Sequence, residues 1–271
     1  MLASVEFDAI AREMDAARRD ARSIAPFSDR YPMLGMGEAY ALGRRLHAGR
    51  LAQGEHAAGR KIGFTNAALW ETLGVREPIW AHMYASGVRP IDDTPLDLKG
   101  FVEPHIEPEI VFRLASVPPR GADLAGIAAS IEWVAQGFEL VQSHFPGWRF
   151  RAPDTVIDGG LHGTLRYGRP LPLKDIAADP VAALANFTLE LFRDGMPVET
   201  GRGANVLGHP LAALAHLAAL IEGDPQAVPL QAGEIITTGT ITAAWPVRAG
   251  ERWSTRLAGI ALEGAEIRFA G

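Results

Sequence analysis

From about residue 56 onward, short runs rich in β-forming residues alternate with glycine and proline. The chain contains 29 glycines and 19 prolines, and the runs between them include KIGF, IEPEIVFRLA, WVAQGFELV, ANFTLELFRDG and EIITTGT. Runs of this length bounded by turn residues predict β-strands, and the Asp-Gly pair in FRDGMPVET predicts a hairpin. Two helices are expected to interrupt this β-rich part, over residues 121–130 and 207–222.

The first part of the chain follows a helical period instead. Apolar residues recur at helical spacing from Val5 to Ala17, with aspartates and arginines between them, and this predicts a helix over residues 3–23. The stretch PFSDRYPMLG then breaks the helix with prolines and a glycine. A second helix is expected over residues 36–52.

The helical period of the first part and the β-type runs of the second together predict an α+β fold in which a helical N-terminal layer covers a β-rich body. No internal repeat and no low-complexity linker divides the 271 residues. We therefore expect one catalytic domain over residues 1–271, with a helical cap over residues 1–55 and a body over residues 56–271.

Composition excludes several classes of function. The net charge is −6 and no long basic run occurs, so we expect no nucleic-acid partner. The chain has no cysteine, which excludes disulfides, thiolate zinc sites and a cysteine nucleophile. The N-terminal segment is charged throughout, unlike a signal peptide, and we expect no apolar run to be long enough to span a bilayer. We expect a soluble, cytoplasmic protein without a membrane partner.

Carboxylates occupy alternate positions of one predicted strand. In EPHIEPEIVF, Glu103, His105, Glu107 and Glu109 fall on every second residue, and alternate residues of a strand share a face. Glu107 and Glu109 would lie about 6.5–7 Å apart along the strand, so their side chains could converge on one cation. The alternative is a solvated strand face that binds nothing.

A third acid, Glu139 in AQGFELVQS, has apolar neighbours on both sides. A buried glutamate costs free energy unless it is paired or bound to a metal. Three carboxylates without cysteine favour a hard ion such as Mg²⁺ or Mn²⁺. The body is therefore expected to bind a metal that keeps coordination positions open for an oxygen-rich ligand.

Several motifs occur together in a characteristic order. They are GRKIGFTNAALWETLGVREPIW, EPHIEPEIVF, GFELVQS, GANVLGHPLAALAHLA and TTGTITAAWPVRAGE, and DRYPMLGMGEAYALGRRL precedes them. In this order and spacing the chain resembles the 2-keto-4-pentenoate hydratase family of the fumarylacetoacetate hydrolase-like superfamily. That family also includes the 4-oxalocrotonate decarboxylases and the 2-oxohept-3-enedioate hydratases.

The resemblance implies a mixed β-roll with a metal at its mouth, in a homo-oligomer. It implies that the metal ligands are Glu107, Glu109 and Glu139. It also implies that Lys61, in RKIGFT, faces the site and that Thr240, in TTGTIT, binds the substrate carboxylate. A structural ion pair between Lys61 and Glu107 or Glu109 is the alternative for the lysine.

The chemistry expected of such a site concerns 2-oxo acids. A metal that a 2-oxo acid chelates acts as a Lewis acid and stabilises the enolate. We expect a hydratase that adds water to a 2-hydroxy-2,4-dienoate and yields a 4-hydroxy-2-oxo acid, as in aromatic-hydrocarbon catabolism. The alternatives are a decarboxylase of a 2-oxo-enedioate and a non-catalytic homologue that binds 2-oxo acids.

The chain departs from the family pattern where acids usually occur. Arg76 and Ile79 occupy the positions matched to aspartates in the segment after the lysine, and Glu77 is a substitute in a different register. Arg76 would suit a second substrate carboxylate because guanidinium groups match carboxylates. A surface ion pair is the alternative for this arginine.

Further departures follow Glu139. The segment LVQSH places His144 where an arginine is usual, and IDGGLHG retains Asp158 but has His162 where a serine is common. We expect His144 and Asp158 to bind substrate. Our hypothesis is that His162 supplies general acid or base catalysis, since a histidine titrates near neutral pH; the alternative is a hydrogen-bonded structural histidine.

Overall fold

The computed structural model describes residues 4–66, 70 and 77–271. The helices are α1 (Ser4–Arg19), α2 (Phe27–Arg30), α3 (Met36–Ala52), α5 (Leu124–Ala129), α6 (Ala152–Ile157), α7 (Pro180–Asn186) and α8 (Pro210–Gly223). The strands are β1 (Ala57–Gly63), β2 (Ile79–Tyr84), β3 (Val88–Pro90), β4 (His105–Leu114), β5 (Ile131–Val141), β6 (His162–Tyr167), β7 (Leu171–Pro172), β8 (Thr188–Arg193), β9 (Met196–Arg202), β10 (Ile235–Thr240), β11 (Trp245–Pro246), β12 (Arg252–Ala258) and β13 (Glu266–Arg268).

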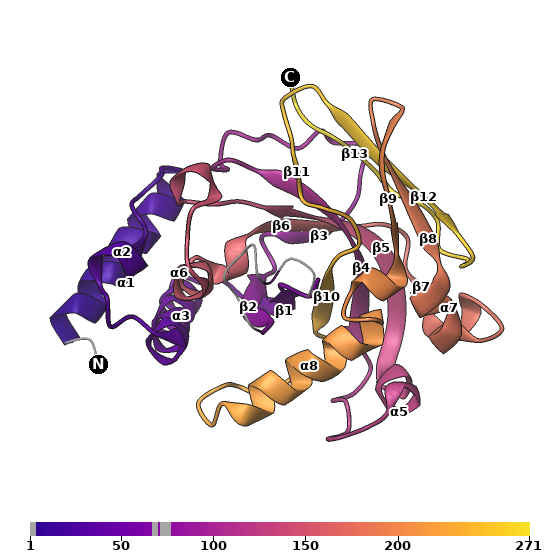
Figure 1. Ribbon diagram of the computed structural model, residues 1–271, viewed down its shortest axis with the longest axis horizontal. Helices are drawn as coiled ribbons and strands as arrows, with labels where there is room; N and C mark the ends of the chain where they lie inside the picture. Colours follow the sequence, from indigo (N-terminus) through magenta and orange to yellow (C-terminus); the bar gives the residue numbers. More distant parts are fainter. Residues whose placement is uncertain (1–3, 67–69, 71–76) are drawn as a thin grey trace.

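A large mixed sheet forms the centre of the molecule (Figure 1). Its strand order is β2-β1-β10-β4-β5-β6-β3, with β11 beside β4 and β7 beside β5. Strand β10 comes late in the chain but inserts between β1 and β4, parallel to the first and antiparallel to the second. This insertion brings together segments that lie far apart in the sequence.

A smaller sheet, in the order β13-β12-β8-β9, lies beside the central one. Strands β8 and β9 form the hairpin expected from the Asp-Gly pair. Asp194 and Gly195 at its turn have φ angles of 51° and 80°, the left-handed conformation that such two-residue turns require.

The helical layer has its own apolar core. Helices α1, α2, α3 and α6 lie together on one side of the central sheet (Figure 1). Ile10, Met14 and Leu42 are fully buried and pack in one cluster with Ile157 of α6. The prediction of an α+β fold with a helical N-terminal layer is therefore confirmed. The boundary at residue 55 stays a prediction, because α6 joins this layer from the middle of the chain.

Helix α8 packs against β10 and β1 of the central sheet, and Asp224 at its end pairs with Arg44 of α3. Leu211, Leu214 and Leu217 are fully buried in the larger core. By length and composition, the stretch Gly203–Gly223 would also suit a membrane span. The expectation that no apolar run is long enough for a bilayer is therefore wrong, although this helix buries one face against the sheet as core helices do.

Several element boundaries differ from the sequence expectations. Helix α1 ends four residues before residue 23 and α5 is shorter than residues 121–130, whereas α3 covers residues 36–52 as predicted. Helices α6 and α7 were not predicted, because six or seven residues are too few to display a helical period. Glu103 has a φ angle of 46° and lies outside β4, so it does not share the face of Glu107.

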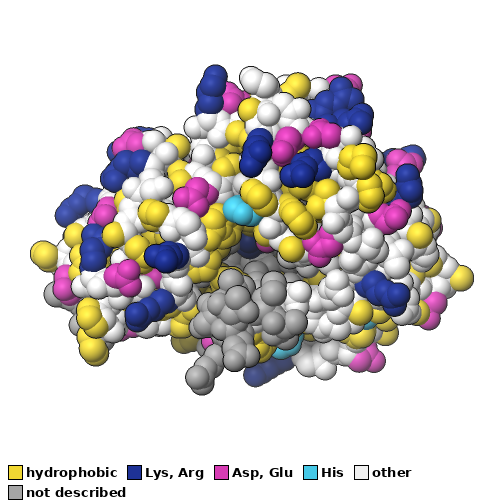
Figure 2. Space-filling model, turned by 45° about the horizontal axis from the view of Figure 1, so that its top comes forward, with side chains coloured by type: hydrophobic (Ala, Val, Ile, Leu, Met, Phe, Trp, Pro, Cys, Tyr) yellow, Lys and Arg dark blue, Asp and Glu magenta, His cyan; other side chains and the backbone are white. Residues whose placement is uncertain are grey.

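Acidic and basic side chains are interspersed on the face shown in Figure 2. Hydrophobic side chains border a hollow near the centre of this face. A hollow bordered by hydrophobic side chains is typical of a ligand-binding site.

Candidate active site and metal centre

Three glutamates meet where β4 and β5 pair. Glu107 lies directly opposite Glu139 in the antiparallel register, and Glu109 lies opposite Gly137. Each of the three acids offers a carboxylate oxygen within 4.8 Å of the others. The period of two on β4 places Glu107 and Glu109 on one face, and the register supplies the third acid.

Glu139 is fully buried and its two oxygens have different surroundings. Oxygen Oε1 lies 3.0 Å from Nζ of Lys61 and accepts a hydrogen bond of 2.7 Å from Nδ1 of His162. Oxygen Oε2 is buried and has no hydrogen-bond partner among the described residues. Lys61 comes from β1 and His162 from β6, so four strands contribute to this arrangement.

The two carboxylate oxygens of Glu109 also have different surroundings. Its Oε2 accepts a hydrogen bond of 2.7 Å from the backbone N–H of Gly239, whereas its Oε1 is buried without a partner in the part of the chain that the structure describes. The register of β10 against β4 shifts between Thr237 and Thr240, and this bulge turns the Gly239 N–H toward the carboxylate. Gly239 has a φ angle of 97°, and a Cβ atom there would lie 1.8 Å from Oγ1 of Thr65.

These residues fit a divalent metal ion. A buried carboxylate oxygen without a partner is costly, and the cluster contains two of them, on Glu109 and Glu139. Three carboxylates and the Lys61 ammonium sum to a charge of about −2, which one divalent ion balances. An all-oxygen donor set suits a hard cation, so Glu107, Glu109 and Glu139 would hold Mg²⁺.

The electrostatics follow from burial and proximity. Loss of hydration raises the pKa of Glu107 to about 7 and that of Glu109 well above its usual value. Burial opposes the charged form of Glu139 too, but Lys61 and then His162 lower its pKa to about 2. Burial alone would lower the pKa of Lys61, yet the three carboxylates outweigh it and raise that pKa.

A pocket with a volume of about 180 Å³ opens beside the acids. Lys61, Glu107, Glu109 and Thr240 line its polar end. Its remaining wall is largely apolar and includes Phe64, Ile79, Val141, Trp148, Phe150 and Leu161. This arrangement suits a ligand with one polar, metal-chelating end and a hydrocarbon tail.

Thr240 lies where the sequence predicted a contact to substrate. Its hydroxyl oxygen is buried and has no hydrogen-bond partner within the structure. A hydroxyl in this position, next to Lys61 and the acids, can donate a hydrogen bond to a bound ligand.

Trp148 forms part of the rim and is held by backbone contacts. Its indole N–H donates to the carbonyl oxygen of Glu103 at 3.1 Å, and its ring packs edge-on against His105. The Glu103 carboxylate accepts from the N–H of Gly147. Glu103 therefore anchors the rim loop and is not a ligand of the acid cluster.

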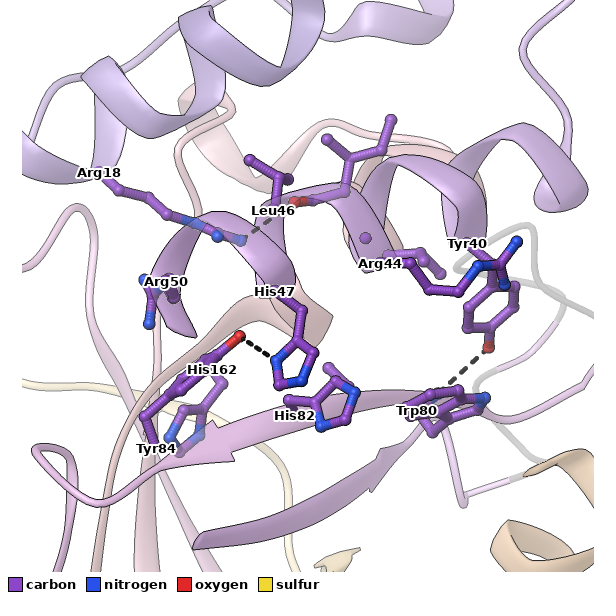
Figure 3. A pocket seen from close by; sticks show the side chains of 15 residues that line it. Arg18, Tyr40, Arg44, Leu46, His47, Arg50, Trp80, His82, Tyr84 and His162 are labelled. Carbon is purple, nitrogen blue, oxygen red and sulfur yellow. Dashed lines mark hydrogen bonds between the residues drawn. The ribbon is translucent and has the colours of Figure 1, made fainter. Parts of the chain in front are cut away.

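His162 contacts the cluster from the side opposite the pocket. Its Nδ1 binds Glu139, but its ring lines a second cavity between α3 and β2, shown in Figure 3. His162 is absent from the described residues that line the pocket of Lys61. The geometry supports the alternative of a hydrogen-bonded histidine, and the acid–base role stays an untested prediction.

His144 and Asp158 lie together outside the pocket. Nδ1 of His144 is 2.9 Å from the Asp158 carboxylate, and both side chains are almost fully buried. Arg18 of α1 also reaches Asp158, at 3.4 Å. These contacts join the helical layer to the body, and neither residue lines the pocket among the described residues, so a direct substrate contact is not supported.

The described residues of the segment before β2 contribute fewer polar side chains to the pocket than the sequence predicted. Glu77 is exposed and is not among the described residues that line the pocket. Arg76 lies outside the described residues. Ile79, at the start of β2, does line the pocket and adds an apolar side chain where the family pattern has an acid.

Some functional residues escaped the sequence analysis. The aromatic wall of Phe64 and Phe150 carries no signal, because apolar residues in short runs are indistinguishable from core. Gly239 could have been suspected from the TTGT motif, since a glycine inside a strand often marks a bulge.

Comparisons with known proteins agree with this geometry. Residues 89–265 match the family described as Fumarylacetoacetate (FAA) hydrolase C-terminal. The 2-hydroxyhexa-2,4-dienoate hydratase of Comamonas testosteroni is 31% identical over 248 residues, which cover 90% of this chain and 90% of that protein. The 2-keto-4-pentenoate hydratase 1 of Dechloromonas aromatica (strain RCB) is 30% identical over 256 residues, covering 93% and 94%.

A solved structure supports the same relationship. The 4-oxalocrotonate decarboxylase from Pseudomonas putida G7, complexed with magnesium and adipate, superposes with a TM-score of 0.90 at 28% identity, covering 99% of each chain. The predicted fumarylacetoacetate hydrolase-like fold, a curled mixed sheet with a helical N-terminal part, is therefore confirmed.

Proposed function

We propose that this chain, which belongs to the 2-keto-4-pentenoate hydratase and 4-oxalocrotonate decarboxylase family of the fumarylacetoacetate hydrolase-like superfamily, is a metal-dependent hydratase. Its substrate would be a 2-hydroxy-2,4-dienoate with an apolar tail, and its product a 4-hydroxy-2-oxo acid. The observation that carries this proposal is the pocket itself, which Lys61, Glu107, Glu109 and a largely apolar wall line, with Glu139 completing the acid cluster beside it.

The polar end would bind the 2-oxo acid group. When held by Glu107, Glu109 and Glu139, a divalent ion supplies Lewis acidity toward a chelating 2-oxo acid. The unpartnered hydroxyl of Thr240 donates to the substrate carboxylate. These contacts place the diene along the apolar wall, and the water that adds to the carbon chain would enter through the open side of the pocket.

Lys61 is assigned the proton transfer. Among the described lining residues it is the one titratable group besides the glutamates. Its Nζ lies 3.0 Å from Glu139, and the carboxylates keep it protonated, so it can deliver a proton to the carbon chain and recover one afterwards. A bound divalent ion would counter the effect of the carboxylates and bring this pKa down.

Decarboxylation of a 2-oxo-enedioate is the second candidate. The observation in its favour is the close superposition on the decarboxylase whose structure contains adipate, a dicarboxylate. Against it, the apolar wall has no cation among the described residues that would meet a second carboxylate. A non-catalytic 2-oxo-acid binder is the remaining alternative.

One assay separates these functions. The purified protein is incubated with Mg²⁺ and either 2-hydroxypenta-2,4-dienoate or a 2-oxo-enedioate, while dienol absorbance and CO₂ are recorded. Hydration removes the dienol absorbance without releasing CO₂, whereas decarboxylation releases CO₂ from the enedioate. A binder does neither, yet oxalate with Mg²⁺ raises its unfolding temperature.

The substrate is the small-molecule partner in this proposal. We further propose that the protein works as a cytoplasmic homo-oligomer, as the family resemblance implies. Light scattering during size-exclusion chromatography measures the subunit number, and a mass equal to one chain would contradict the oligomer.

A further inference from the structure

A second cavity, separate from the active-site pocket, lies between the helical layer and β2. It has a volume of about 60 Å³, and none of its lining residues lines the active-site pocket. Side chains from α3 and β2 face each other across it, and Arg18 reaches toward it from α1 (Figure 3). Of its lining residues, the active site contacts His162, through the bond from Nδ1 to Glu139.

The cavity carries positive charge that its surroundings do not fully balance. Arg50 forms no ion pair with any described residue, and its guanidinium lies 4.6 Å from the centre of the Tyr84 ring. Burial and then the neighbouring Arg18 lower the pKa of Arg50. Arg18 itself is paired with Asp158, and Arg44 is paired with Asp224. The Glu55 and Asp15 carboxylates act on Arg50 through space, so Arg50 is left as the guanidinium of this cavity without a direct ion pair among the described residues.

The cavity also contains an unpartnered ring nitrogen. Nδ1 of His162 donates to the Glu139 carboxylate at 2.7 Å. Nε2 is buried without a hydrogen-bond partner among the described residues, in a side chain that is only 8% exposed. A hydroxyl group would satisfy this nitrogen, because a hydroxyl can both donate and accept a hydrogen bond.

Two stacked imidazoles also line the cavity. His47 and His82 stack with ring centres 3.6 Å apart, and His47 lies 3.0 Å from the Tyr84 hydroxyl. Burial and then Arg60 lower the pKa of His82 to about 2, and burial also lowers the pKa of His47. Arg50 is therefore the group in this cavity best placed to pair with an anion.

We propose that this cavity binds a small hydroxycarboxylate, whose carboxylate pairs with Arg50 and whose hydroxyl forms a hydrogen bond with Nε2 of His162. A guanidinium group matches a carboxylate with paired hydrogen bonds. At roughly 10–15 Å³ for each water-sized position, 60 Å³ accommodates a molecule of about five non-hydrogen atoms. Glycolate has this size and both functional groups. The proposal does not depend on the reaction in the other pocket.

Glycolate titration by calorimetry tests this proposal. The protein contains Mg²⁺ and a small excess of oxalate over subunits, so that a chelating ligand already occupies the metal site. We expect saturable binding with a Kd of about 1 mM, at least about threefold weaker binding of acetate, which lacks the hydroxyl, and no binding of neutral glycolamide.

Arg50→Gln should weaken glycolate binding about tenfold or more, because the charged hydrogen bonds are lost. Arg45→Gln is the matched control, since it removes the same charge from an exposed position of α3. It should change the Kd less than about twofold.

A second variant fills the cavity without touching a charge. A Cβ atom on Gly43 would approach Val156, another lining residue, at 3.9 Å, whereas one on Gly49 meets nothing within 4 Å. Gly43→Leu should abolish glycolate binding, and Gly49→Leu on the same helix should preserve it. Three results would each overturn the proposal: no saturable binding, equal affinity for acetate, or binding unchanged in both Arg50→Gln and Gly43→Leu.

Discussion

At the scale of single residues, Glu139 connects the parts of the site. One of its oxygens is held by Lys61 and His162, and the other is free for a metal. A histidine that donates its ring N–H to a ligating carboxylate orients that ligand. We therefore interpret His162 as a positioning residue for Glu139.

Replacement of His162 distinguishes this interpretation from acid–base catalysis. His162→Ala should weaken Mg²⁺ binding about 10- to 100-fold, with turnover largely restored by excess Mg²⁺. His162→Asn keeps an N–H donor and should recover most of the affinity. Metal titrations monitored by the initial rate provide both values.

The sequence hypothesis makes the opposite prediction for the same variants. If His162 transferred the proton, saturating Mg²⁺ would not restore the rate of His162→Ala, and its pH profile would lose a limb. That outcome would move His162 back among the catalytic residues.

Protons and the metal ion compete for the same carboxylates. Without metal, the pKa of Glu107 is about 7 and burial raises that of Glu109 well above its usual value, so the folded protein retains protons on Glu107 between about pH 5 and 7. Mg²⁺ must displace these protons, and its apparent affinity therefore rises as pH rises through this range.

We expect the stabilisation by Mg²⁺ to follow this competition. The difference in unfolding temperature between samples with Mg²⁺ and with EDTA should be small near pH 5.5 and should grow toward pH 8. Differential scanning fluorimetry across the pH series measures it. A difference that stays constant or shrinks with rising pH would contradict the raised pKa values.

At the scale of elements, strand β10 matters most because its bulge shapes one wall of the site. The bulge needs a left-handed residue at Gly239, whose N–H fixes Glu109. Neighbouring Thr240 then presents its hydroxyl to the pocket. Strand β10 thus shapes the site through its bulge as well as through its pairing with β1 and β4.

Gly239→Ala tests the bulge. The new Cβ would collide with Thr65 in addition to straining the backbone, so the free energy of unfolding should fall by about 2–4 kcal/mol. The response to Mg²⁺ should weaken as well, because Glu109 loses its alignment. Chemical denaturation with and without Mg²⁺ measures both effects.

Gly250→Ala is the matched control for this prediction. Gly250 has a φ angle of 82°, but a Cβ atom there meets nothing within 4 Å. Its cost should be about 1 kcal/mol from backbone strain alone, with the Mg²⁺ response intact. Equal losses in the two variants would show that the contact with Thr65 is unimportant.

At the scale of the whole molecule, a buried cluster joins the helical layer to the body. Asp158 accepts from His144 and lies 3.4 Å from Arg18 of α1. Asp158→Asn should lower the free energy of unfolding by about 2–4 kcal/mol, because it leaves Arg18 without its counter-charge. Urea denaturation measures this loss.

The same variant tests the substrate-binding role that the sequence suggested. If the cluster is structural, Asp158→Asn leaves KM nearly unchanged at a temperature where the protein is folded. Asp179→Asn is the control, because an asparagine still caps α7. A large rise in KM without a loss of stability would return Asp158 to the binding site.

The sequence alone predicted a great deal of this molecule. The alternation in EPHIEPEIVF predicted that Glu107 and Glu109 share a face, and the apolar surroundings of Glu139 indicated a third buried acid. These inferences succeed because strand periodicity and the cost of burying charge are local properties, which can be inferred from a few neighbouring residues.

Tertiary structure alone decided which residues meet. Only the pairing of β4 with β5 places Glu107 opposite Glu139, and only the folding of the chain puts His162 behind Glu139 and joins His144 to Asp158 away from the pocket. Local sequence does not predict which side of a sheet a distant side chain will approach. That depends on register and on the packing of segments brought together from opposite ends of the chain.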